Sequence, residues 1–95
     1  MQLDQKIERN PDFIFRMILD EAILVPIRKD IADLNALYTL NDVGAFVWQQ
    51  LDQPQTLGEI QTNLLVEYDA EPETILQDLQ AYIEDMLGID ALRLV

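Results

Sequence analysis

The sequence has no cysteine and no histidine, and only six of its 95 residues are lysine or arginine. Without cysteine there is no disulfide framework, no thiolate nucleophile and no zinc–thiolate site. Without histidine the chain lacks the side chain that most often transfers protons near neutral pH and most often binds transition metals. We therefore expect no metal and no cofactor in this protein.

Acidic residues outnumber basic ones, with 18 Asp and Glu, so the formal net charge is -12. A negative surface repels nucleic-acid phosphates and anionic lipid headgroups, so we expect neither nucleic acid nor a membrane as a partner. No apolar run approaches the roughly 20 residues of a membrane span, and Met1–Asp4 lacks the basic-then-apolar order of a signal peptide. The sequence therefore predicts a cytoplasmic protein.

Length and hydrophobicity indicate one folded domain, because 49% of the 95 residues are hydrophobic. Residues 1–11 are polar and end in the turn signal Asn10–Pro11, so we expect a loose N-terminal arm there and a domain over residues 12–95. The closing residues 91–95 alternate apolar and polar side chains once, which favours a last strand or a docked end.

The first half of this domain has the residue composition of β-strands. Residues 13–19 and 22–27 are rich in aromatic and β-branched side chains and predict a β-hairpin with its turn at Asp20–Glu21. Residues 28–36 show no clear period and predict a loop. A third, short strand is expected at Leu37–Leu40.

The second half predicts three amphipathic helices. Asn41 is a good N-cap for the first, which should end near Leu51. Thr56–Glu59 matches a capping box and begins the second, while Pro72 suits the first position of the third, which should end near Gly88. Because strands precede helices in separate blocks, the expected fold class is α+β rather than parallel α/β.

Candidate catalytic and metal sites are weak in this sequence. A calcium loop beginning at Asp69 would place Thr74 where glycine is needed and Gln80 where glutamate is needed. Glu84 and Asp85 are adjacent on a predicted helix, so their carboxylates point apart and cannot share one apolar pocket. We therefore expect no catalytic residues, no metal ligands and no enzyme activity.

A small sheet with an exposed edge can bind an extended peptide as an additional strand. The strand expected at Leu37–Leu40 is short, uncharged and followed directly by a helix, which makes it the favoured edge. The alternative is that this edge is covered within the protein.

A sheet beside three helices is also typical of winged-helix DNA-binding proteins, but the second and third helices lack the Lys and Arg of a recognition helix.

Segment Tyr38–Leu51 resembles the central signature of the PqqD family, with a strand ending in Leu–Asn, a small residue, an apolar pair with Trp and a closing Leu. The resemblance continues through Thr56–Ile60, similar to the family's Thr-x-x-Glu-Ile, and into the third helix. Ile23–Ile27 is similar to the family's second strand, so the resemblance covers about residues 12–90. At Asp52–Gln55 the glycine of the family pattern is missing, so we assign no pyrroloquinoline quinone pathway.

This resemblance implies a winged-helix-like domain with a three-stranded antiparallel sheet followed by three helices. It implies a non-catalytic peptide chaperone, a recognition element that binds the leader segment of a ribosomally synthesised precursor peptide as an added β-strand. The partner would be a modifying enzyme such as a radical SAM maturase or cyclase, and the peptide would lie between the third strand and the third helix. The peptide-binding residues expected on this basis are Leu37, Tyr38, Thr39, Leu40, Ile75, Asp78, Leu79 and Tyr82.

Two other functions stay open at this point, a winged-helix regulator that binds nucleic acid and a structural subunit that docks on a maturase. The peptide hypothesis requires an unpaired edge beside Leu37–Leu40. If the protein itself occupied this edge, for example with its tail Leu92–Val95, the hypothesis would fail.

Overall fold

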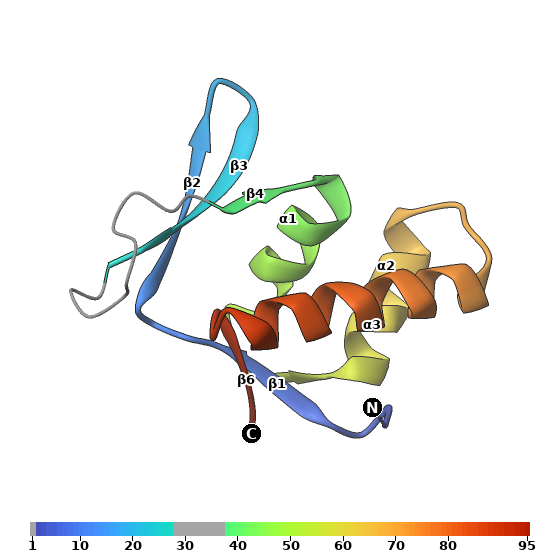
Figure 1. The fold of residues 1–95 in the computed structure, drawn as a ribbon. Helices are drawn as coiled ribbons and strands as arrows, with labels where there is room; N and C mark the ends of the chain where they lie inside the picture. Colours follow the sequence, from blue (N-terminus) through green and yellow to red (C-terminus); the bar gives the residue numbers. More distant parts are fainter. Residues whose placement is uncertain (1, 28–37) are drawn as a thin grey trace.

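The computed structural model describes residues 2–27 and 38–95. Within them the elements are β1 (Lys6–Arg9), β2 (Phe13–Ile18), β3 (Glu21–Pro26), β4 (Tyr38–Leu40), α1 (Asp42–Gln50), β5 (Gln55–Thr56), α2 (Leu57–Glu67), α3 (Pro72–Gly88) and β6 (Leu92–Leu94). The strands form two antiparallel sheets, in the orders β2-β3-β4 and β5-β1-β6 (Figure 1). The α+β, winged-helix-like fold is thus confirmed, and the β5-β1-β6 sheet is an addition that the sequence analysis did not anticipate.

The hairpin of β2 and β3 is confirmed, and its strands pair along all six residues of each. Its turn consists of Leu19 and Asp20, whose φ angles are 49° and 69°. Two consecutive left-handed residues are the geometry of a type I′ turn, whose twist matches that of the strands. The turn therefore lies one residue earlier than expected, because Glu21 already pairs with Ile18 as part of the ladder.

β4 is the outer strand of its sheet and pairs with β3. Within residues 2–27 and 38–95 no strand lies on its other side. The tail does not cover this edge, since it forms β6 and pairs with β1 in the other sheet. The third strand is therefore confirmed at Tyr38–Leu40, while Leu37 and the loop expected at residues 28–36 lie outside the described residues.

The N-terminal segment is not the loose arm that we expected. β1 lies between β5 and β6 and pairs with both, and its Ile7 is fully buried. Asn10, which is 1% exposed, donates from its side-chain amide to the Asp90 carbonyl at 2.7 Å and from its backbone to the Ala91 carbonyl at 2.9 Å. The folded domain therefore includes this strand, which joins the N-terminal segment to the C-terminal tail (Figure 1).

The helices begin where the sequence predicts. The Asn41 side chain accepts a hydrogen bond from the Gly44 backbone at 2.8 Å and caps α1. Thr56 and Glu59 form both bonds of the capping box of α2, at 3.0 and 3.1 Å. Pro72 is the first residue of α3. Local hydrogen bonding thus fixes where α1 and α2 start, independently of their packing.

The hydrophobic core lies between the three helices and the two sheets. Every layer contributes fully or nearly fully buried side chains, such as Leu24 of β3, Trp48 of α1, Leu64 of α2 and Ile83 of α3. Within the part of the chain that the structure describes, no helix has both the length and the hydrophobicity to cross a membrane.

The burial of Ile7 predicts a large loss of stability when its side chain is shortened. Ile7→Ala should lower the free energy of unfolding by about 2–5 kcal/mol, because the removed methyl groups leave a cavity in the core. Urea denaturation followed by the fluorescence of Trp48 measures this change. Lys6→Ala, at an exposed position of the same strand, is the control and should change stability by less than about 0.5 kcal/mol. Equal stability of the two variants would contradict the packing of β1.

Candidate functional site

A hollow of about 370 Å³ lies between the first turn of α1 and the middle of α3. Asn41, one of its lining residues, directly follows the last residue of β4, so the hollow adjoins the C-terminal end of this outer strand. The residues that line it are Asn41, Val43, Gly44, Asp78, Ala81, Tyr82 and Asp85. We call β4, whose outer edge is unpaired within the described residues, and this hollow together the β4–α3 site.

The ring of Tyr82 reaches the hollow because residue 44 is glycine. A Cβ atom on Gly44 would lie 2.9 Å from Cε1 of Tyr82 and 3.2 Å from Oδ1 of Asn41, which is closer than carbon atoms normally pack. The absence of a side chain here therefore allows α3 to approach the start of α1 closely. Gly44 is needed for space and not for an unusual backbone angle, since it lies in regular helix.

The hydroxyl of Tyr82 is buried and has no hydrogen-bond partner among the described residues. Burial raises the pKa of Tyr82 well above its usual value, and the positive charge of Arg9 opposes this effect only weakly. The phenol stays protonated at physiological pH, so it does not serve as a general base. Tyr82 contributes the apolar surface of its ring to the hollow.

Four of the expected peptide-binding residues lie at the β4–α3 site. Thr39 is exposed on β4, and the neighbouring Tyr38 is half-buried, with its ring centroid 6.3 Å from that of Phe13. Asp78 and Tyr82 line the hollow from α3. Two of the predicted residues thus lie on β4 and two line the hollow from α3.

The other three described residues of that prediction, Leu40, Ile75 and Leu79, point into the core. They are 7%, 5% and 0% exposed, so they support the site from behind and do not line it. The reason is the helical period of α3: Ile75, Leu79 and Ile83 form the stripe that packs on the core, and Asp78 lies on the neighbouring stripe.

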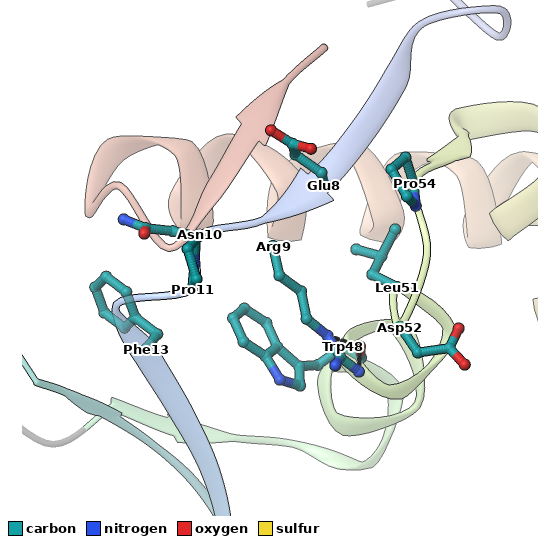
Figure 2. Close-up of a pocket in the computed structure, with 9 residues that line it drawn as sticks. All are labelled: Glu8, Arg9, Asn10, Pro11, Phe13, Trp48, Leu51, Asp52 and Pro54. Carbon is teal, nitrogen blue, oxygen red and sulfur yellow. Dashed lines mark hydrogen bonds between the residues drawn. The ribbon is translucent and has the colours of Figure 1, made fainter.

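A second hollow, of about 360 Å³, lies where the chain passes from β1 to β2 beside the end of α1 (Figure 2). Arg9 extends from β1 to its floor, where Nε and Nη2 both donate to the backbone oxygen of Trp48, the former at 2.8 Å. The guanidinium carbon lies 5.3 Å from the centre of the Trp48 ring system. Burial lowers the pKa of Arg9, and the negative charge of Asp52 opposes this shift.

This arrangement makes Arg9 a structural residue. The last turn of α1 contains no basic residue of its own, and its exposed carbonyl groups carry partial negative charge. A cation from β1 at this position satisfies the Trp48 carbonyl and fixes α1 against the second sheet. The hollow around Arg9 therefore lies at a junction between elements, where the side chains of Arg9 and Asn10 are already hydrogen-bonded.

No set of acidic side chains within residues 2–27 and 38–95 is arranged to hold a metal ion. The two hollows also contain no pair of a nucleophile and a base. The arrangement at β4 and α3 is suited to binding an extended chain.

The family described as "Coenzyme PQQ synthesis protein D (PqqD)" matches residues 21–91. The chain belongs to the PqqD family. The matched segment runs from the start of β3 to just beyond α3, so it includes both the edge of β4 and the adjoining hollow. The resemblance derived from the sequence signature is confirmed.

No curated protein matches the chain. A solved structure described as "TbiB1 in Complex with the TbiA(beta) Leader Peptide" is similar, with a TM-score of 0.74 and 20% sequence identity. The match covers 90% of this chain and 94% of that one. At this level of identity the likeness shows that the two proteins share a fold.

Sequence reasoning missed five residues of the hollow, namely Asn41, Val43, Gly44, Ala81 and Asp85. The helical period could have indicated the α3 residues. Positions 81 and 82 each lie three or four residues from both 78 and 85, so the four positions share one face of the helix. No comparable signal existed for the first turn of α1, since its approach to α3 depends on tertiary packing.

Tyr82→Phe should leave the free energy of unfolding at pH 7 unchanged or slightly higher, because the hydroxyl has no hydrogen bond to lose. The folded-state pKa of Tyr82 is raised, so the wild type should lose stability as the pH rises above about 10, where the unfolded phenol ionises. Ionisation of this one phenol lowers the free energy of unfolding by at most about 1.4 kcal/mol per pH unit, and the variant should lack that decrease. Urea denaturation from neutral to alkaline pH tests this, and equal slopes would contradict the burial of the phenol.

Arg9→Met should lower the free energy of unfolding by about 1–3 kcal/mol, because hydrogen bonds from a charged group to the Trp48 carbonyl are lost. Arg93→Met removes the same charge from β6 and is the matched control, which should change stability by less than about 0.5 kcal/mol. Thermal or urea unfolding measures both. If the two variants were equally stable, Arg9 would not fix α1 to β1.

Proposed function

We propose that this protein binds the leader segment of a ribosomally synthesised precursor peptide as an additional strand on β4. The observation that carries the proposal is the unpaired outer edge of β4 beside the hollow between α1 and α3. A peptide paired with β4 gains main-chain hydrogen bonds, and alternate side chains can enter the hollow. Membership of the PqqD family and a fold shared with a protein solved with a leader peptide support this assignment.

The energetics require both parts of the β4–α3 site. β4 has three residues, so it offers only a few backbone groups, each contributing about 1 kcal/mol net when bonded. Micromolar affinity corresponds to about 8 kcal/mol. Backbone pairing alone therefore falls short, and side chains of the peptide in the hollow must contribute the remainder.

We infer that the protein acts by presenting the bound peptide to a modifying enzyme, such as a radical SAM maturase or cyclase, and is not itself a catalyst. The lack of histidine and cysteine and the engaged or protonated state of Arg9 and Tyr82 favour binding over chemistry. Precursor peptides are made in the cytoplasm, so the encounter is assigned to that compartment.

Nuclear magnetic resonance tests the location of the site directly. Two sets of peptides are titrated into the ¹⁵N-labelled protein. One set consists of leader peptides encoded by short reading frames beside the gene of this protein, and the other is selected from a random library. The largest amide shift changes should fall on Tyr38–Leu40 and on the residues that line the β4–α3 hollow. Changes confined to the hollow around Arg9, or binding of duplex DNA in preference to any peptide, would contradict the proposal.

Thr39→Pro should weaken binding of such a peptide at least tenfold, because proline removes an amide from the strand and obstructs its edge. The Thr39 side chain is exposed, so the replacement removes little packing. Fluorescence anisotropy measures the affinity, and circular dichroism checks that the variant is folded. Thr39→Val keeps the amide and is the matched control, expected to bind like the wild type.

A second measurement covers the case in which Thr39→Pro does not fold. Peptides methylated on one backbone nitrogen at a time are titrated into the wild type. In an added strand only every second amide faces β4, so binding should weaken at alternate positions. Uniform tolerance of methylation would show that the peptide is not paired as a strand.

A further inference from the structure

Among the residues that the structure describes, the hollow of the β4–α3 site is lined by negatively charged side chains and by no positively charged one. Its charged lining residues are Asp78 and Asp85, both exposed. Across residues 2–27 and 38–95, neither carboxylate has an ion-pair or hydrogen-bond partner. The basic residues in that part of the chain are Lys6, Arg9, Arg16 and Arg93, and none of them lines the hollow.

The elements around the hollow reinforce this charge. α3 contains no lysine or arginine along its length, and Glu73 and Glu84 add further exposed carboxylates to it. The first turn of α1 contributes Asp42. The carboxylates that line the hollow and those on the described parts of α1 and α3 therefore attract a cation and repel an anion.

The spacing of the two carboxylates suits an extended ligand. Asp78 and Asp85 are seven residues apart on one helix, which separates them by about 10 Å along its axis. Tyr82 and Ala81 lie between them and present apolar surface. A long basic side chain can lay its methylene groups on such a surface while its charged end reaches a carboxylate. A strand that runs along α3 covers the same 10 Å in about three residues.

We propose that the β4–α3 site selects leader peptides in which a lysine or arginine points from the added strand toward α3 and pairs with Asp78 or Asp85. This inference rests on the proposed function and adds a substrate class to it, namely basic leaders. The formal net charge of -12 also favours such peptides by accelerating their encounter with the protein at low salt.

The test compares peptide selection by three proteins from one random library displayed on phage. The wild type should enrich lysine or arginine at one position relative to the apolar anchors. The double variant Asp78→Asn, Asp85→Asn should still select peptides through β4 but lose that enrichment. Glu73→Gln, Glu84→Gln changes the net charge of α3 equally at residues that do not line the hollow, so it should keep the enrichment.

A double-mutant cycle then quantifies the contact. The best peptide and its Lys→Met or Arg→Met counterpart are titrated into the wild type and the Asp78→Asn, Asp85→Asn variant. Removing the carboxylates should weaken the basic peptide about tenfold and the methionine peptide less than twofold. Added salt should narrow the difference between the two peptides for the wild type.

The remaining outcomes distinguish failure of this inference from failure of the proposed function. Peptides that bind and are sensitive to Thr39→Pro, but show no basic preference, overturn this inference and leave the proposed function intact. If the Glu73→Gln, Glu84→Gln control lost the enrichment of lysine or arginine to the same extent, the preference would come from the net charge alone. That result would overturn the assignment to Asp78 and Asp85. If no selected peptide is sensitive to Thr39→Pro, or to backbone methylation, the proposed function and this inference fail together.

Discussion

The contact between the ring of Tyr82 and the backbone of α1 at Gly44 determines the shape of the site. A Cβ atom at residue 44 would lie 2.9 Å from the ring, so any other residue would displace the Tyr82 ring from its position against α1. The same face of α3 that carries Tyr82 also carries Asp78 and Asp85, while the neighbouring stripe of Ile75 and Leu79 packs on the core. Because residue 44 is glycine, α3 can pack on the core through Ile75 and Leu79 and at the same time place Tyr82 against the start of α1.

The second sheet explains how so small a domain can leave the outer edge of β4 without a partner strand among the described residues. β1 joins the tail of the chain to the segment before α2, and Arg9 connects the same strand to the end of α1. These long-range contacts hold the ends of the helices in place without any contribution from the outer edge of β4. An unpaired edge can therefore be maintained for a ligand, because the fold does not depend on covering it.

The sequence analysis was right where structure follows from local interactions and wrong where it depends on distant ones. The starts of α1 and α2 follow from side chains within three residues of the helix, Asn41 and the pair Thr56–Glu59. β1 was missed because it has one fully buried side chain, Ile7, and its partner strands lie about 50 and 85 residues further along the chain. On α3 the sequence prediction combined residues that line the hollow, Asp78 and Tyr82, with residues of the core, Ile75 and Leu79, because the two stripes are adjacent on the helix and only the packing distinguishes them.

The negative charge of the protein opposes the self-association that an unpaired strand edge favours. Such an edge pairs with any available strand, including that of another copy of the same protein. Two copies each carrying a formal charge of -12 repel one another, and Asp78 and Asp85 add negative charge to the hollow at the end of β4. A basic peptide is attracted by the same charges. The hollow beside β4 can therefore discriminate between self-association and ligand binding by the sign of the charge that approaches it, before any backbone hydrogen bond has formed.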